Sequence, residues 1–212
     1  MRPAPLRLQQ FARLPRPGAV KTRLQPALTA EAACAVHCEL LQKVAADLLA
    51  ARLGAVELWL DDAGEHPALR RCLDAGLCGP FRQRGEDLGA RMENALLDGL
   101  RRAGAVILTG SDCPGLDPGY LRGAAAALAH CDVLFGPAED GGFVLLGCRR
   151  METGLFAGVP WGTAQALAES EARVAARGWV TRRLPLRFDI DTPQDLRRWR
   201  RLQAEAGSGA GA

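Results

Sequence analysis

The sequence predicts an α/β protein with a mostly parallel sheet and helices on both faces. Short apolar runs alternate with helical stretches along the chain, which is the pattern that βαβ units produce. The run 105–109 (AVILT) is apolar on both faces, as central strands of a parallel sheet are. The length of 212 residues suits a single domain of this class. We therefore expect one domain over residues 1–206 and a disordered Gly/Ala/Ser tail over 207–212.

The first half of the chain predicts three strands and three helices. A long helix over 29–51 is indicated by Thr29, a good N-cap, and by Leu40, Val44 and Leu48 at helical spacing. The other apolar runs and helical stretches predict strands at 6–13, 55–60 and 81–84 and helices at 66–75 and 88–102.

The second half continues the same alternation. Pro118 suits the first turn of a helix over 118–129. The remaining patterns predict strands at 105–109, 133–136, 143–146 and 179–184 and helices at 163–177 and 193–204.

Composition narrows the functional classes. The net charge of +3 is too small to argue for a nucleic-acid partner. No apolar run approaches the roughly 18–20 residues of a membrane helix, and the first residues lack the apolar core of a signal peptide, so we expect a cytoplasmic protein. The seven cysteines form no CxxC pair and are expected to be free thiols, with a metal site at Cys34, His37 and Cys38 as a much weaker alternative.

A basic loop follows the first predicted strand. Arg13, Arg16, Lys21 and Arg23 place four positive charges within residues 13–23, around Gly18. Arginine binds phosphate through two parallel bonds and lysine acts as a point charge, so the loop is a candidate site for phosphates. The spacing is not that of a Walker A loop. The alternative is an ordinary solvated loop.

Two acidic segments also follow predicted strands. Asp112 comes directly after the strand at 105–109, and a hard cation such as Mg²⁺ takes carboxylates together with phosphate oxygens. Asp189 and Asp191 alternate, so they lie on one side of an extended segment. Each segment has a plainer alternative: a turn at Asp112, and a capping box formed by Thr192 and Asp195.

Two further loops carry weaker signals. The run 136–143 (GPAEDGGF) holds acids and glycines between two strands, although Asp-Gly is also a hairpin signal. The run 83–92 (QRGEDLGARM) leads into a helix for which Asp87 is a plausible N-cap.

The motifs occur along the chain in the order FARLPRPGAVKTRL, RQRGEDLGARM, GSDCPGL, GPAEDGGF, VPWGT and DIDTPQDL. Together they resemble the radical-SAM/selenodomain-associated transferase family over residues 6–203. That family is similar to the nucleotide-diphospho-sugar transferases of the GT-A fold. The KTRL element also resembles 2-phospholactate guanylyltransferase, and DTPQDL resembles a run in CMP-KDO synthetase. The family usually has Lys at Arg13 and Tyr at Phe143, so a hydrogen bond to the acceptor at Phe143 is in doubt.

The resemblance implies roles for these residues. Lys21 and Arg23 would hold nucleotide phosphates, with Arg13 and Gly18 in the same loop. Asp112 and Asp191 would bind Mg²⁺ or Mn²⁺, with Asp189 as the alternative second ligand. The implied residues for the base and the acceptor are Gln83, Gly85, Asp87, Asp140, Gly141, Gly142 and Trp161.

The reaction favoured by these residues is nucleotidyl transfer, in which a small phosphorylated acceptor attacks the α-phosphorus of an NTP and releases pyrophosphate. A phosphate nucleophile needs no strong base, which agrees with the lack of a histidine in any motif. Glycosyl transfer from a nucleotide-sugar is the first alternative, with Asp140 as a base. A non-catalytic nucleotide-binding module is the second.

Overall fold

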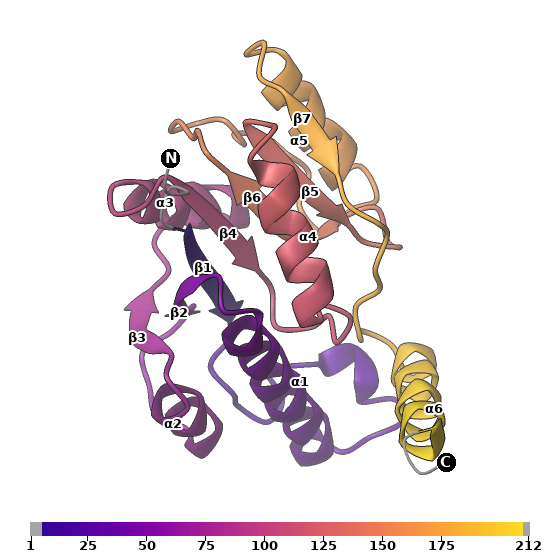
Figure 1. The fold of residues 1–212 in the computed structure, drawn as a ribbon. Helices are drawn as coiled ribbons and strands as arrows, with labels where there is room; N and C mark the ends of the chain where they lie inside the picture. The colour runs from indigo at the N-terminus through magenta and orange to yellow at the C-terminus, as the bar shows by residue number, and fades with distance from the viewer. Residues whose placement is uncertain (1–5, 210–212) are drawn as a thin grey trace.

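The structure is a computed structural model that describes residues 6–209, and it confirms the predicted fold class (Figure 1). The strands are β1 (Leu6–Ala12), β2 (Gly54–Leu60), β3 (Cys78–Arg82), β4 (Ala105–Thr109), β5 (Val133–Pro137), β6 (Phe143–Cys148) and β7 (Thr181–Arg183). The helices are η1 (Thr22–Leu24), a 3₁₀ turn, and α1 (Ala30–Ala51), α2 (Pro67–Asp74), α3 (Leu88–Leu100), α4 (Pro118–Leu128), α5 (Ala166–Ala175) and α6 (Pro193–Gly209).

The seven strands form one sheet in the order β3-β2-β1-β4-β6-β5-β7. β1 pairs in parallel with both β2 and β4, and β5 pairs in parallel with β7. β6 is antiparallel to β4 and to β5, so the Asp-Gly signal does mark a hairpin between β5 and β6. As a result, the carboxyl ends of β1, β4, β5 and β7 all meet at one edge of the sheet.

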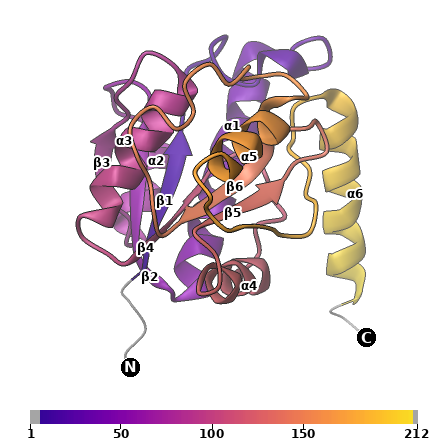
Figure 2. The same cartoon turned by 90° about the horizontal axis from the view of Figure 1, so that it is seen from above.

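Helices cover both faces of this sheet, as Figures 1 and 2 show. On one face, α1, α2 and α4 pack on a cluster that includes Leu8, Leu58 and Ile107. On the other, α3 and α5 pack on a cluster that includes Val106 and Leu108. Neighbouring residues of β4 thus point to opposite cores, which explains why this run is apolar throughout.

The predicted helix starts are mostly correct because their caps can be seen in the sequence. The Thr29 side chain accepts a hydrogen bond from the Ala32 backbone N–H at 3.2 Å and begins α1. α5 begins only at Ala166, later than predicted, because residues 161–165 form turns. α6 extends to Gly209, over part of the tail that was expected to be disordered; residues 210–212 lie outside the described part.

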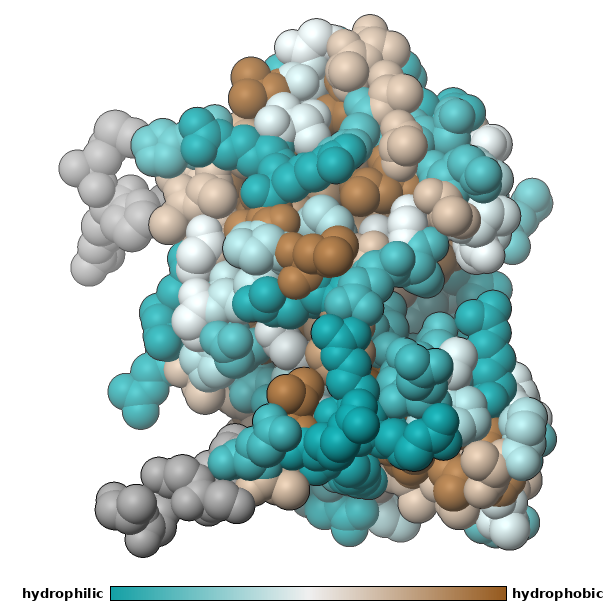
Figure 3. Space-filling model, turned by 90° about the vertical axis from the view of Figure 1, so that its right-hand side faces the viewer, coloured by the Kyte–Doolittle hydropathy of each residue, from teal (hydrophilic) through white to brown (hydrophobic). Residues whose placement is uncertain are grey.

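α6 lies at the edge of the molecule and closes a third, smaller apolar cluster with α1, in which Trp199 and Ile190 are buried. Figure 3 looks onto this side of the molecule, and its lower part is mostly hydrophilic. Within the described residues, no helix combines the length and apolar character that crossing a membrane requires.

Candidate functional site

The topology selects one place in the sheet for a ligand. The chain runs outward from β1 to β2 and β3, then returns to place β4 on the other side of β1. In open α/β sheets, ligands bind where the order of strands reverses, at the carboxyl ends of the strands. The basic loop leaves β1 and the Asp112 loop leaves β4 at this reversal, so the two predicted motifs flank it.

Backbone hydrogen bonds bring the last acidic segment to the same place. The Ile190 N–H donates to the carbonyl oxygen of Asp112 at 3.0 Å. The predicted capping box then fixes the start of α6: Thr192 N–H donates to Asp195 Oδ2 at 2.7 Å, and Asp195 N–H donates to Thr192 Oγ1 at 3.3 Å. Asp191, between these two anchors, therefore lies beside Asp112 although the two are far apart in sequence.

Lys21 occupies the centre of this arrangement. Its Nζ lies 2.8 Å from Asp112 Oδ1 and 3.1 Å from Asp191 Oδ1, and it donates to the carbonyl oxygen of Ile190 at 2.6 Å. Only 4% of the Lys21 side chain is exposed, against 42% for Asp112 and 37% for Asp191. The Lys21 backbone has φ 49°, a left-handed conformation that is uncommon outside glycine. Such strain persists where the surrounding contacts impose it, which is frequent at functional sites.

The charges at this centre are unevenly matched. Burial alone lowers the pKa of Lys21, but Asp112 and Asp191 outweigh that effect and raise it above its ordinary value, so Lys21 is a cation. Burial raises the pKa of Asp189 to about 8, and the neighbouring charges of Asp112 and Asp191 add to the effect. Asp189 is therefore a neutral carboxyl at neutral pH, and two carboxylates, Asp112 and Asp191, face one buried ammonium group. The negative charge of this pair exceeds that of the single ammonium group, so the site can take further positive charge.

The other basic residues of the loop divide into two groups. Arg23 Nη1 lies 3.5 Å from Asp191 Oδ2, and its side chain is 70% exposed, so it can reach a ligand at low cost. Arg13 is exposed and donates to the carbonyl oxygen of Ala19 at 3.4 Å. Arg16 instead pairs with Asp62, beyond the end of β2. Gly18 has φ 81° and allows the loop to turn back toward Lys21.

Sequence analysis gave His37 a place only in the alternative metal site with Cys34 and Cys38, and did not predict its position beside Asp112. Its Nε2 lies 3.0 Å from the carbonyl oxygen of Arg13, which can only accept, so Nε2 carries the proton. Its Nδ1 then faces Asp112 Oδ1 at 3.9 Å. Burial lowers the pKa of His37, so the ring is neutral. The only signal in the sequence was its place among the apolar positions of the long helix.

A cavity of about 240 Å³ adjoins this cluster on the side of α3 and α5. Fifteen residues line it: nine are apolar, three are glycines, and the polar ones are Asp140, Thr163 and Asp189. Asp189 belongs to both the cavity wall and the carboxylate cluster, so the two are continuous.

The structure brings the predicted Asp140, Gly142 and Trp161 together in this wall. Asp140 Oδ1 accepts from the Gly142 N–H at 2.9 Å, which shapes the β5–β6 turn. Gly141 has φ 87°, and a Cβ there would lie 2.3 Å from the carbonyl oxygen of Ala164, so only glycine fits. Trp161 stands edge-on to Phe143, with 6.0 Å between ring centroids.

Gln83, Gly85 and Asp87 have structural explanations. The Gln83 side chain is buried and donates to the carbonyl oxygens of Ala12 and Trp59, which ties the ends of β1 and β2 together. Gly85 has φ 141°, and a Cβ there would lie 2.6 Å from the Arg91 backbone nitrogen. Asp87 is the N-cap of α3. Their binding roles remain predictions.

Glu93 is a second residue that the sequence did not indicate. It is buried in α3, and its carboxylate accepts from the backbone N–H groups of Gly154 and Phe156 at 2.8 and 2.6 Å. These bonds hold the loop that leads from β6 to Trp161. A buried carboxylate placed on two backbone donors is a tertiary arrangement that no local pattern reveals.

We predict that Glu93→Gln loosens this loop. The amide can accept one N–H but presents its own N–H₂ to the other, so the free energy of unfolding falls by about 1–3 kcal/mol. Thermal melts should show a drop of several degrees, while exposed Glu65→Gln leaves the midpoint unchanged. Equal melting of the two variants would contradict the anchoring role.

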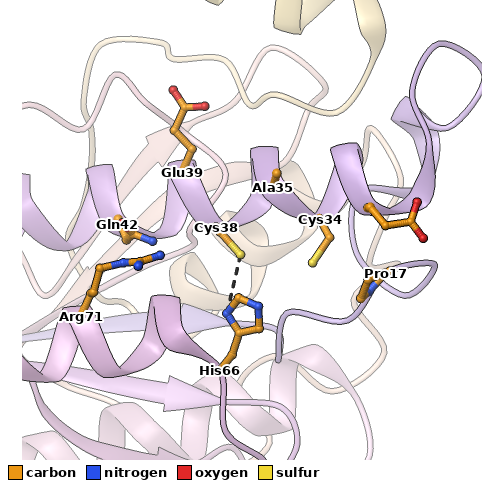
Figure 4. A pocket seen from close by; sticks show the side chains of 9 residues that line it. Pro17, Cys34, Ala35, Cys38, Glu39, Gln42, His66 and Arg71 are labelled. Atoms are coloured by element: carbon orange, nitrogen blue, oxygen red, sulfur yellow. Dashed lines mark hydrogen bonds between the residues drawn. The ribbon is translucent and has the colours of Figure 1, made fainter.

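A second cavity, of about 510 Å³, lies between α1, α2 and Pro17. Figure 4 shows Cys34 and Cys38 of α1 beside His66, the N-cap of α2, with Cys38 Sγ 3.9 Å from His66 Nδ1. His37, by contrast, points to Arg13 and Asp112, so the weak hypothesis of a metal at Cys34, His37 and Cys38 is not supported. Burial raises the pKa of Cys38 to about 12, and all seven cysteines are free thiols.

The residues that fit a divalent cation are Asp112 and Asp191. Their oxygens already converge on one positive charge, Lys21 Nζ, and carboxylate oxygens are the ligands that Mg²⁺ and Mn²⁺ prefer. Within residues 6–209, no three His, Cys, Asp or Glu side chains are grouped so that they could hold a metal ion on their own. The donor set therefore fits a cation that takes its other ligands from a substrate and from water.

Comparison with known proteins gave a match to one family model. Residues 44–163 match the family model DUF2064, described as an uncharacterized protein conserved in bacteria. No curated protein matches the chain.

Solved structures confirm the fold. A protein from Desulfovibrio desulfuricans G20, proposed to be a nucleotide-diphospho-sugar transferase, is 28% identical with a TM-score of 0.80, over 90% of this chain and 84% of that one. CMP:2-keto-3-deoxy-manno-octonic acid synthetase in complex with CTP is 16% identical, with a TM-score of 0.60 over 95% and 99%. Rv0371c from Mycobacterium tuberculosis H37Rv, in complex with manganese, is 18% identical, with a TM-score of 0.50 over 92% and 97%.

The GT-A-like fold class is thus confirmed, and the neighbours agree with the prediction of a nucleotide-dependent transferase. The association with radical-SAM proteins and the likeness to 2-phospholactate guanylyltransferase stay predictions.

Proposed function

The chain belongs to the DUF2064 family, and from that premise we propose that it is a nucleotide-dependent transferase whose phosphate site is centred on Lys21. The observation that carries the proposal is the contact of Lys21 with both Asp112 and Asp191 at the strand reversal. A buried ammonium group held by two half-exposed carboxylates is placed to exchange them for the oxygens of a phosphate.

The roles of the charged residues follow from their exposure. Lys21 provides a fixed positive charge, and exposed Arg23 and Arg13 extend it toward solvent. Asp112 and Asp191 would hold Mg²⁺ or Mn²⁺, which would neutralise phosphate charge and act as a Lewis acid. Cytidine nucleotide and manganese in two proteins of this fold support both ligands.

The leading reaction is nucleotidyl transfer from an NTP. A phosphate oxygen of the acceptor, or a hydroxyl oxygen that gives its proton to a carboxylate such as Asp140, forms a bond to the α-phosphorus. The bond from that phosphorus to the bridging oxygen breaks, and pyrophosphate leaves with the electron pair. Lys21 and Arg23 oppose the charge that develops on the phosphates. The residues contribute positioning and electrostatic stabilisation, which dominate catalysis of phosphoryl chemistry.

Glycosyl transfer from a nucleotide-sugar is the second candidate, and the cavity favours it. The expected phosphorylated acceptor needs cationic partners, but the described lining residues include no Lys or Arg. In this alternative an acceptor hydroxyl attacks the sugar's anomeric carbon, the nucleoside diphosphate leaves with the electron pair, and a carboxylate such as Asp140 takes the proton.

A reaction panel separates the candidates. The protein would be incubated with each NTP or nucleotide-sugar, Mg²⁺ or Mn²⁺, and a set of phosphorylated and neutral acceptors, and pyrophosphate and nucleoside diphosphate would be measured. Pyrophosphate from NTPs supports the leading reaction, and nucleoside diphosphate from a nucleotide-sugar supports the second. If no nucleotide binds or turns over with either metal, the proposed function is wrong.

A further inference from the structure

The wall of the 240 Å³ cavity is mainly apolar and aromatic. Phe11, Phe143 and Trp161 contribute rings, and further apolar side chains come from α3, β4 and β6. Phe143 is edge-on to Phe135 as well as to Trp161, so its ring is held from two sides. A ligand in this space must therefore present an apolar body.

The described residues of the wall include no Lys or Arg. Its acidic residues are Asp140 and Asp189, and Thr163 already donates its hydroxyl to the carbonyl oxygen of Pro160 at 2.8 Å. Lys21, in the adjoining cluster, is engaged by Asp112 and Asp191. A phosphate or carboxylate on the ligand would therefore lie beside the Asp140 carboxylate without a cationic partner, which is unfavourable in a partly buried site.

Two glycines keep the cavity open. A Cβ on Gly89, at the start of α3, would lie 2.9 Å from both Cζ2 and Nε1 of Trp161 and 3.1 Å from Cβ of Phe156. Gly89 therefore lets the indole lie flush against α3. Gly141 allows the close approach of the 163–165 turn at the other rim. Trp161 forms part of the wall, and Gly89 sets the position of its indole ring.

From these contacts we infer that the cavity takes the acceptor, and that the acceptor is an alcohol with an apolar body and no phosphate or carboxylate group. This inference rests on the proposed function and replaces the phosphorylated acceptor expected from sequence. Its hydroxyl group would lie toward Asp140 and Asp189, next to the site of the nucleotide phosphates. Gly89 is a positioning residue, since it acts through Trp161.

The test uses two probes of one shape, 2-phenylethanol and its phosphate ester. The chain has four tryptophans, so ¹⁵N-labelled protein gives four indole N–H signals, and Trp161→Phe identifies that of Trp161. We expect the alcohol to shift the Trp161 signal saturably and the ester to bind at least about tenfold more weakly. If the ester binds as tightly as the alcohol, or the alcohol leaves the Trp161 signal unmoved, the inference is overturned.

Two variants sharpen the result. Gly89→Ala should weaken binding of the alcohol, whereas Gly123→Ala in α4, where a Cβ meets nothing within 4 Å, should not. Leu88 is exposed at the rim of the cavity, so Leu88→Lys should leave the fold intact. The variant should raise affinity for the ester severalfold, because it adds a cation to the wall. An ester that stays equally weak on Leu88→Lys would contradict the charge argument.

A nucleotide titration of the same sample keeps the two proposals apart. If the alcohol binds as expected but no nucleotide binds with Mg²⁺ or Mn²⁺, the cavity assignment stands and the proposed transferase function fails. If nucleotides bind and the alcohol does not, the function stands and the acceptor class is wrong.

Discussion

Asp112→Asn should abolish metal-dependent turnover while leaving the protein folded. The substitution keeps the side chain's size but removes one of the two carboxylate charges that face Lys21. Asp112 and Asp191 would hold the cation that opposes the charge developing on the phosphates. Loss of one such electrostatic stabiliser typically costs about 10²–10³ in rate, and we expect at least that for Asp112→Asn and for Asp191→Asn. The rate is measured as product release with the donor that the reaction panel identifies, at saturating Mg²⁺ or Mn²⁺.

Asp74→Asn is the matched control, since Asp74 is an exposed carboxylate at the end of α2. It should retain full activity. Activity within a few-fold of wild type for both Asp112→Asn and Asp191→Asn, in protein that melts normally, would show that these carboxylates are not the metal ligands.

Lys21→Met should change two affinities in opposite directions. Nucleotide binding weakens because the buried positive charge at the phosphate site is lost. Binding of Mn²⁺ without nucleotide strengthens because Lys21 no longer competes for Asp112 and Asp191. An ion-pair partner worth about 1–2 kcal/mol corresponds to roughly 5–30-fold in each constant. Calorimetric titrations with Mn²⁺ and with a nucleotide measure both.

Lys43, the chain's other lysine, pairs with Asp47 on α1 and provides the control Lys43→Met. That variant should change neither affinity. A Lys21→Met protein that binds Mn²⁺ more weakly than wild type would contradict the idea that Lys21 and the cation share these carboxylates.

Local patterns predicted the parts of the fold that depend on local chemistry. The Thr29 cap, the doubly apolar strand at 105–109 and the capping box of Thr192 and Asp195 all appear as expected. The start of α5 was misplaced because turns in residues 161–165 have no distinct signature. The order of the strands in the sheet could not be predicted from the sequence, since it depends on pairing between segments that are far apart in the chain.

The site was predictable where motifs follow strands, and hidden where contacts cross the fold. Lys21, Asp112 and Asp191 were predicted separately and meet at one point. The ion pairs between them, however, arise from a backbone bond between Ile190 and Asp112 that links distant segments. Glu93, and the position of His37 beside Asp112, escaped prediction because a buried polar residue on a helix has the same local pattern as a core position.

The most direct test of the central claim is a titration of Mn²⁺ followed by the electron paramagnetic resonance signal of the free ion, with a slowly hydrolysed nucleotide present. We predict that wild-type protein and nucleotide together remove about one equivalent of free Mn²⁺ beyond what the nucleotide alone removes. The double variant that combines Asp112→Asn with Asp191→Asn should bind none of this additional Mn²⁺. An undiminished excess in the double variant would contradict a nucleotide and metal site at Lys21, Asp112 and Asp191.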